Sequence, residues 1–541
     1  MNCRPAILFF FSVVLLAACK KKIAEPPVAV DSFLKVSGTK IIDGNNQPVR
    51  LQGVAFGNEV WSNSPLPPYT HHSEADYSRL KAMGMNVIRF YLNYKTFEDD
   101  ATPYQYKQTG WEWINQNITW AKKYGIYLIL NMHAPQGGYQ SQGTGDALWN
   151  DIENQNRLTA LWETIAEKYK DEKQIIGYGP VNEPVPANNI SQWQQLAQRI
   201  INEIRAVDKK HILFIEKAIW VKGQAETADY NFPAVTDNNM AYEFHFYDPH
   251  LYTHQLFSWA GTGEGGKYPD ESVLSYTSSQ WYTATFNNPS IGSGTNNWQY
   301  FEGVRYPVSD VNIKMAVPAL VAAGATGKVY FDNIEIKEYD ASGNFVQTIL
   351  QMNLNTNSGW SFWSRNGSGT GGISTTTGYG DNGSIFIEGP TDDCNYSNYS
   401  RVFRIRQGYQ YQINGSMKGE NIAAGANCKL RIDFLKTDDP IFGRNKQYLE
   451  FLVKRYTDWA DAKGKPLYMG EFGAGYHCFQ NGKGGLQWVA DMIDIANANN
   501  IYFTYHAYHE DSFGLYYGYG TLPDPIQANQ PLIDLFTQKL K

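Results

Sequence analysis

The chain has 541 residues and a formal net charge of -7, and 43% of its residues are hydrophobic, 15% aromatic and 18% charged. This length exceeds what one hydrophobic core usually serves, so it predicts two domains or one large, elaborated domain. The mild acidity and the absence of a basic stripe exclude nucleic acid as an expected partner. The many aromatic rings suit sugar binding, although filling a core is the alternative use.

The first residues have the pattern of an export signal. Arg4 precedes an apolar run over residues 6–16, which is too short to span a bilayer and ends in small residues. The segment Leu16-Ala17-Ala18-Cys19 resembles the bacterial lipoprotein signal, in which the cysteine is lipidated; a plain signal peptide is the alternative. We expect residues 1–18 to be removed and residues 19–35 to form a tether. The protein is then exported and held by its lipid at the cell envelope, on the outer membrane.

From about residue 36, strand-like and helix-like stretches alternate along the chain. The predicted strands are 49–57, 86–91, 126–133, 175–184, 212–216, 240–247, 467–473 and 501–508. The predicted helices are 72–84, 111–125, 155–170, 191–208 (with Ser191 as its cap), 445–461 and 485–499. Strands that are apolar on both faces predict parallel strands covered by helices. Their regular repetition favours a closed (β/α)8 barrel of the α/β class.

This alternation is interrupted between about residues 271 and 439. The composition shifts there to Gly, Ser, Thr, Asn and Tyr, with short alternating runs such as 327–339 and 429–435. Such runs between turn residues predict an antiparallel β-sandwich. We therefore expect a barrel formed by residues 36–270 and 440–541, with a carbohydrate-binding-like sandwich, 271–439, inserted after the sixth barrel strand. Its candidate sugar platforms, which core burial would equally explain, are Trp281, Trp298, Trp360 and Trp363.

The cysteines and histidines give no sign of a metal site. Cys394 and Cys428 lie in the predicted sandwich and could pair, or each could be a separately buried thiol. No spacing of Cys or His fits a ligand set. We expect neither a metal nor another cofactor.

Two predicted strands end in a glutamate. Asn182-Glu183-Pro184 ends the fourth strand, and Glu471 stands near the end of the seventh. Pro184 biases Glu183 toward an extended backbone, which would aim its carboxyl along the strand axis. A barrel enzyme places its working residues at the C-terminal ends of strands, and two carboxyl groups are what glycosidic cleavage requires.

Five segments occur in one order, each on a different strand: NVIRFY at 86–91, ILNMH at 129–133, VNEP at 181–184, HFY at 245–247 and MGEFG at 469–473. Together they resemble glycoside hydrolase family 5, a (β/α)8 family that includes cellulases and mannanases. The resemblance implies Glu183 as acid/base and Glu471 as nucleophile. It also implies substrate contacts from Asn182, Arg89, His133, His245 and Tyr247. By register, His506 stands where the family has a tryptophan platform, so that platform is altered here or supplied by another ring.

The resemblance implies a retaining endo-β-1,4-glucanase that acts on a polysaccharide, with a β-mannanase or an exo-β-glucanase as alternatives. We expect Glu471, beside Arg89 and Tyr247, to be ionised, and Glu183, close to that charge, to keep its proton. Retention of configuration requires the two carboxyl groups to lie about 5–5.5 Å apart. A non-catalytic glycan-binding lipoprotein on the cell surface is the rival from another class. Loss of either glutamate would favour it, and both are present.

Overall fold

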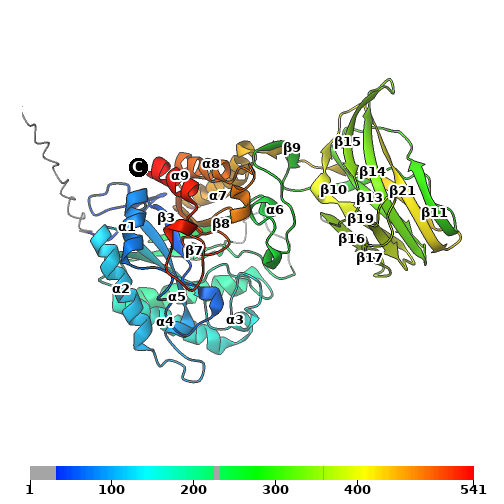
Figure 1. Ribbon diagram of the computed structural model, residues 1–541. Helices are drawn as coiled ribbons and strands as arrows, with labels where there is room; N and C mark the ends of the chain where they lie inside the picture. The colour runs from blue at the N-terminus through cyan, green and yellow to red at the C-terminus, as the bar shows by residue number, and fades with distance from the viewer. Residues whose placement is uncertain (1–31, 224–231, 358) are drawn as a thin grey trace, which may run out of the picture.

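The structure, a computed structural model, describes residues 32–223, 232–357 and 359–541 (Figure 1). Cys19, the predicted signal and most of the predicted tether lie outside these residues. Eight parallel strands close into a barrel: β3 (Gln52–Phe56), β4 (Val87–Asn93), β5 (Tyr127–Ala134), β6 (Ile175–Gly179), β7 (Ile212–Glu216), β8 (Met240–Phe246), β24 (Leu467–Phe472) and β25 (Tyr502–Tyr505). The predicted (β/α)8 barrel is confirmed.

Helices surround the barrel between successive strands: α1 (Glu74–Met83), α2 (Gln108–Tyr124), α3 (Asp146–Asn150), α4 (Ile152–Tyr169), α5 (Ile190–Val207), α6 (His250–Thr253), α7 (Lys446–Lys463), α8 (Gly485–Ala498) and α9 (Gln530–Leu540). Helix α1 ends at Gly84, whose φ of 86° is left-handed. The predicted cap of α5 is wrong. Asn189, with an extended φ of -160°, is the N-cap residue, and Ser191 already lies inside the helix.

The barrel interior changes from apolar at its floor to polar at its mouth. The hairpin β1 (Lys35–Ser37) and β2 (Lys40–Ile42) closes the floor, where Ile41 packs with Val87, Ile129 and Ile212 in one apolar cluster. Successive side chains of a strand point to opposite faces. The next inward position of β4 after Val87 is therefore Arg89, which contacts carboxylates of three other strands. The prediction that the strands are apolar on both faces fails for the upper half of the barrel.

A β-sandwich is inserted between β8 and β24, the sixth and seventh strands of the barrel in chain order. One sheet runs in the order β10 (Gln280–Ala284), β22 (Asn427–Lys436), β13 (Met315–Ala323), β19 (Asp393–Asn398) and β16 (Trp360–Ser364), with β20 (Phe403–Arg404) beside β13. The other runs β11 (Gly294–Glu302), β21 (Gln410–Ile422), β14 (Lys328–Tyr339), β18 (Ser384–Glu388) and β17 (Thr370–Ser374), with β12 (Tyr306–Pro307) and β15 (Phe345–Met352) at its side.

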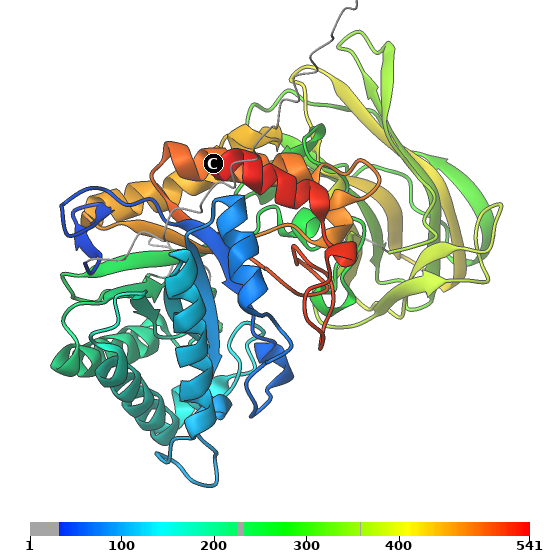
Figure 2. The same cartoon turned by 60° about the vertical axis from the view of Figure 1, so that its left-hand side comes forward.

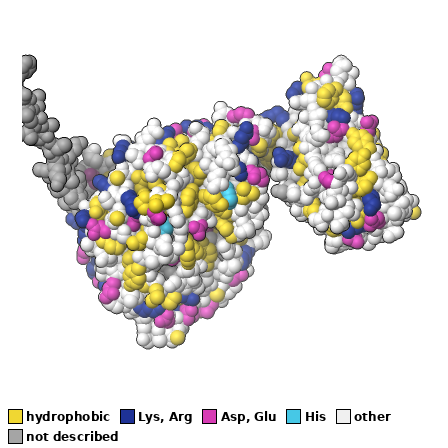
Figure 3. All heavy atoms as spheres, in the orientation of Figure 1, with side chains coloured by type: hydrophobic (Ala, Val, Ile, Leu, Met, Phe, Trp, Pro, Cys, Tyr) yellow, Lys and Arg dark blue, Asp and Glu magenta, His cyan; other side chains and the backbone are white. Residues whose placement is uncertain are grey.

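The two sheets share one core, and the sandwich joins the barrel through a narrow connection. Leu320 and Ile432 of the first sheet pack in one cluster with Phe331 and Ile413 of the second. At the junction, β9 (Asp270–Ser275) pairs with β23 (Phe442–Arg444), so the outgoing and returning chains run side by side (Figures 1 and 2). The space-filling view shows barrel and sandwich as two separate masses (Figure 3). Within the described residues, no helix has both the length and the apolar character needed to cross a bilayer.

The two sandwich cysteines do not pair. Cys394 of β19 and Cys428 of β22 are both buried free thiols. Strand β13 separates them, because Ala322 faces Cys394 on one side and Cys428 on the other. Two strand spacings amount to about 9–10 Å, which exceeds the reach of a disulfide. The alternative of two separate thiols is the correct one.

Candidate active site

A cleft of about 530 Å³ lies at the C-terminal mouth of the barrel and includes Glu183 and Glu471 among its lining residues. Loops after several different strands complete its walls with aromatic rings. The most exposed of these rings, at 38–56%, are those of Trp61, Trp220, Trp259 and Tyr519. Exposed rings around a pair of buried carboxyl groups give the cleft both platforms and a polar centre.

Glu471 is held by three donors. Arg89 Nη1 lies 2.7 Å from Glu471 Oε1, the Tyr91 hydroxyl donates to the same oxygen at 2.5 Å, and the Tyr247 hydroxyl donates to Oε2 at 2.8 Å. The contacts expected with Arg89 and Tyr247 are present, whereas the one with Tyr91 was not foreseen. Donors on both oxygens fix the orientation of the carboxylate and favour its ionised form.

Glu183 lies four residues beyond the end of β6, in a loop. Its φ of 43° is left-handed, so the predicted extended backbone is wrong. Such a conformation costs on the order of 1–3 kcal/mol and persists only where its surroundings impose it. Here the N–H of Asn182 donates to the Met132 carbonyl at 2.9 Å, and the N–H of Ile219 donates to the Pro184 carbonyl at 3.0 Å. The loop is thus tied to its neighbours on both sides of Glu183.

His245 joins the two glutamates. Its Nδ1 lies 2.8 Å from Glu183 Oε1 and 3.5 Å from Glu471 Oε2. One oxygen of each carboxyl group and one nitrogen of His245 all lie within 4.8 Å of one another. Positions 183 and 471, which are far apart in sequence, therefore meet in one pocket.

The other predicted residues also gather here. Asn182 Oδ1 accepts from Arg89 Nη2 at 2.8 Å, and its Nδ2 lies 3.4 Å from His133 Nε2. The ring of His133 stacks on Tyr91 with centroids 3.9 Å apart. His506 directly follows β25, with Nδ1 3.0 Å from the Tyr91 hydroxyl and Nε2 3.4 Å from Glu510. Its ring lies inside a polar network, and the more exposed rings of the cleft come from other segments.

Comparison with known proteins identifies the family. A family model described as cellulase, glycosyl hydrolase family 5, matches residues 42–309. The chain belongs to glycoside hydrolase family 5. The matched stretch holds barrel strands β3 to β8 and Glu183, whereas Glu471 lies beyond it.

Curated relatives are similar to this family 5 protein over part of its sequence. A β-xylosidase of Phanerodontia chrysosporium is 29% identical over 222 residues, 34% of this chain and 46% of the relative. Endoglucanase C of Acetivibrio thermocellus is 27% identical over 213 residues, 39% of this chain and 60% of the relative. The chain thus spans between 46% and 60% of the length of these two relatives. Among solved structures, endoglucanase Cel5A of Thermotoga maritima aligns with 90% of this chain and 96% of its own, at 14% identity and a TM-score of 0.48.

Two further carboxyl groups lie under the family 5 site and were missed in the sequence. Glu216 ends β7 and Glu243 stands within β8, and both are buried against Arg89 and His245. The sequence carried a signal for both, since Glu216 is the last residue of the predicted strand 212–216. Glu243 precedes His245 by two residues, so both side chains point to the same side of the strand. Attention to strand ends alone overlooks Glu243, which lies inside its strand.

Opposing effects set the charge of the pocket. Burial alone would raise the pKa of the Glu471 carboxyl, but the charges of His245, His506 and Arg89 hold that pKa well below its usual range. Burial would lower the pKa of His245, but Glu216, Glu471 and a hydrogen bond with Glu183 raise it well above its usual range. The pocket thus pairs an ionised Glu471 with a cationic His245.

Among the residues that the structure describes, two sets of side chains have the closeness that a metal ion requires: Glu183, His245 and Glu471, and, one layer deeper, Glu216, Glu243 and His245. Arg89 contacts three of these four carboxyl groups at 2.7–3.3 Å. Its guanidinium already supplies a positive charge beside these carboxyl groups, and it would repel a divalent ion. The donor set does not fit a metal.

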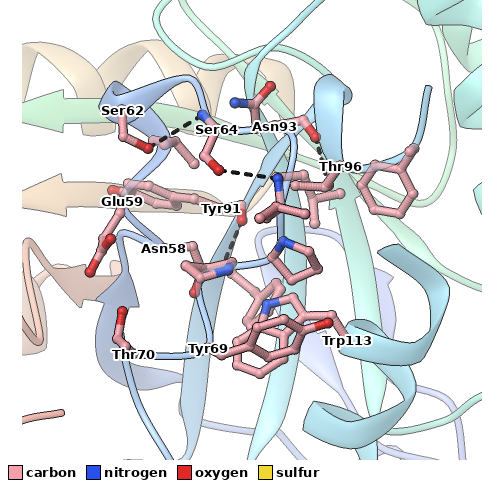
Figure 4. A pocket seen from close by; sticks show the side chains of 17 residues that line it. Asn58, Glu59, Ser62, Ser64, Tyr69, Thr70, Tyr91, Asn93, Thr96 and Trp113 are labelled. Carbon is pink, nitrogen blue, oxygen red and sulfur yellow. Dashed lines mark hydrogen bonds between the residues drawn. The ribbon is translucent and has the colours of Figure 1, made fainter. Parts of the chain in front are cut away.

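A second hollow of about 280 Å³ lies beside β4, under the segment of residues 58–70 (Figure 4). None of the predicted site residues lines it. Asn58 Nδ2 donates to the backbone carbonyl of Tyr91 at 2.8 Å. This side of the hollow supports the strand that presents Tyr91 to Glu471.

We expect Arg89→Met to lower the free energy of unfolding by about 3–5 kcal/mol, because it leaves buried carboxylates without their cation. Arg365→Met is the matched control. The Arg365 side chain is 61% exposed and pairs with Asp393 at the surface of the sandwich. Its loss should change the free energy of unfolding by less than about 0.5 kcal/mol. Urea unfolding of both variants measures this difference, and equal losses would contradict a central role for Arg89.

Proposed function

We propose that this protein is a retaining endo-β-1,4-glucanase. It would cut bonds in the interior of a β-glucan polysaccharide. The observation that carries the proposal is the pair of carboxyl groups in one open cleft, with one oxygen of Glu183 and one of Glu471 within 4.8 Å. Carboxyl groups about 5–5.5 Å apart suit direct attack on the sugar, whereas an inverting enzyme needs roughly 6.5–9.5 Å to admit a water.

In the first step, Glu471 Oε2 or Oε1 attacks the anomeric carbon while the glycosidic C–O bond breaks. Glu183 gives its proton to the leaving oxygen, and the negative charge left on Glu183 faces His245 Nδ1 at 2.8 Å. The product is a glycosyl ester of Glu471. In the second step Glu183 takes a proton from water, the water oxygen bonds to the anomeric carbon, and Glu471 is released.

The endo-glucanase assignment has two supports. One similar protein, 27% identical over 213 residues, is named endoglucanase C. The loop after β8 brings His254 and Trp259 to the cleft, and Trp259 is 56% exposed. An open cleft with exposed rings suits a polymer that extends beyond both sides of the reacting bond. A β-mannanase or an exo-β-glucanase would use the same carboxyl pair.

We further propose that the sandwich binds glycan through the outward face of the sheet that contains β13. Trp281 of β10 and Trp363 of β16, at opposite edges of this sheet, are each 49% exposed. Between them Arg431 pairs with Asp433, with Nε and Oδ1 2.5 Å apart. Trp360, by contrast, is 7% exposed and belongs to the core. Trp298 lies on the other sheet, edge-to-face with Tyr379. The two exposed rings can stack on the apolar faces of sugars, and the charged pair between them can bind sugar hydroxyl groups.

We also propose that Cys19 carries a lipid that holds the enzyme at the outer membrane. The support is the segment Leu16-Ala17-Ala18-Cys19 after a short apolar run. Surface attachment would place the cleft where it meets polymers too large to import.

The purified protein should release new reducing ends from carboxymethylcellulose, and the first product should keep the β configuration in proton NMR. Glu471→Gln should abolish turnover without loss of fold, and Glu183→Gln should slow it by roughly 10²–10⁴-fold. Mannan and xyloglucan assayed in parallel would reveal a different backbone preference. The absence of product from every polymer and from oligosaccharides would favour the non-catalytic, glycan-binding alternative.

Replacing Trp281 and Trp363 by alanine should weaken retention of the protein on insoluble cellulose by roughly two- to tenfold per ring, because each ring contributes about 0.5–1.5 kcal/mol beyond its buried area. Hydrolysis of short soluble oligosaccharides should stay unchanged. Trp298→Ala, on the other sheet, is the matched control. If all variants are retained on cellulose as well as the wild type, the sheet that contains β13 is not the binding face.

Cys19→Ser should move the protein from the membrane fraction to the soluble fraction of the expressing cells, because the acyl chains are then lost. Mass spectrometry of the N-terminal peptide should find acyl groups in the wild type and none in the variant. A wild-type peptide that begins after a plain signal cleavage, without lipid, would contradict the proposal.

A further inference from the structure

Four carboxyl groups and two cationic side chains share one buried cluster under the cleft. Arg89 reaches three of the carboxyl groups, with Nη1 2.7 Å from Glu471, Nε 2.8 Å from Glu243 and Nη2 3.3 Å from Glu216. The side chain of Arg89 is fully buried, and those of the three glutamates are at most 5% exposed. Water therefore does little to screen their charges.

His245 links this cluster to the proposed acid. Its Nδ1 lies 2.8 Å from Glu183, and its Nε2 lies 3.4 Å from Glu216 and 3.6 Å from Glu243. The groups that face Glu216 are therefore His245 and Glu243 from β8, Arg89 from β4 and Glu183 from the loop after β6.

The charges balance only if two of the four carboxyl groups carry a proton. Arg89 and His245 offer two positive charges, whereas four ionised glutamates would offer four negative ones. The nearby His506 has its own acidic partner, Glu510, at 3.4 Å. An uncompensated charge in a buried site is costly, and neighbouring carboxylates resist ionising together. Two ionised and two protonated glutamates make the cluster neutral.

Contact distances indicate which two are ionised. Glu471 has Arg89 at 2.7 Å and hydroxyl donors on both oxygens, and Glu243 has Arg89 at 2.8 Å. Of the three carboxyl groups that Arg89 contacts, Glu216 has the longest contact, at 3.3 Å. Glu183 is the group that needs a proton in the proposed reaction.

We infer that Glu216 holds a proton in the resting protein and so balances the charge under the catalytic pair. This inference rests on the proposed function only in assigning the other proton to Glu183. Burial first, and then the charges of Glu243 and Glu183, raise the pKa of Glu216 well above its usual range, against the opposing effect of His245 and Arg89.

The proton on Glu216 directs the two cations toward the reacting groups. With Glu216 neutral, the charge of His245 is free to stabilise the carboxylate that forms on Glu183 when its O–H bond breaks. An ionised Glu216 would add a negative charge under Glu471 and Glu183 and oppose that step. Glu216 is thus a positioning residue that acts through His245 and Arg89.

A matched pair of variants tests this inference. Glutamine has the shape of a protonated glutamate and no charge, so Glu216→Gln should preserve the cluster, whereas Glu243→Gln should remove a carboxylate that Arg89 needs. We expect Glu216→Gln to keep kcat/KM within about threefold and Glu243→Gln to lower it by more than about tenfold.

Thermal unfolding of the full protein supplies a readout that does not depend on catalysis. A carboxyl group with a raised pKa takes up a proton on folding, so it costs stability as the pH rises above about 4.3, the value in the unfolded chain. Glu216→Gln removes this cost. Its Tm at pH 7.5 should equal or exceed that of the wild type, and the difference should grow from pH 5 to pH 7.5.

The two readouts separate the possible failures. A Tm of Glu216→Gln that falls as far below the wild type as that of Glu243→Gln would mean that Glu216 is ionised, and would overturn the inference. A protein without hydrolytic activity but with the expected Tm difference would refute the proposed function and leave the charge balance of Glu216 intact. Infrared spectra at pH 7 provide a second check, because Glu216→Gln should remove one carbonyl band of a protonated carboxylic acid.

Discussion

The buried guanidinium of Arg89 is the interaction on which the rest of the site depends. It stands on β4 and contacts Glu216 of β7, Glu243 of β8 and Glu471 of β24, so one side chain connects four barrel strands. Its planar group offers several donors in fixed directions, which a lysine could not do. Without Arg89, burial of the four carboxyl groups in one cluster would leave negative charge without a cation, which is strongly destabilising.

The barrel makes this arrangement possible through the alternation of its strands. Because every second side chain points inward, one strand can contribute a residue to the floor, a residue to the buried charge layer and a residue to the mouth. Strand β4 contributes Val87, Arg89 and Tyr91 in this order, and β8 contributes Ala241, Glu243 and His245. The apolar floor excludes water from below, and the charge layer then sets the protonation of the reacting groups above it.

Much of the fold and several members of the site could be predicted from the sequence. The order of strands and helices, the interruption of the barrel and the two strand-end glutamates are local patterns, and local patterns are visible in a linear chain. The extended backbone expected at Glu183 was wrong because ties from the neighbouring β5 and from Ile219 outweigh the local bias of Pro184. Pairing of Cys394 and Cys428 could not be judged, since only the strand order places β13 between them.

The sequence by itself determined the barrel, the inserted β-sandwich and the place of Glu471 near the end of its strand and of Glu183 close to the end of another, because hydrophobic periodicity and turn residues report the environment of each segment. Only the tertiary structure decided that Glu216 and Glu243 lie under these residues, that Tyr91 donates to Glu471, and that His506 belongs to a polar network. Those relations join strands that are distant in the chain, and they depend on closure of the barrel, which brings the inward faces of all eight strands to one axis.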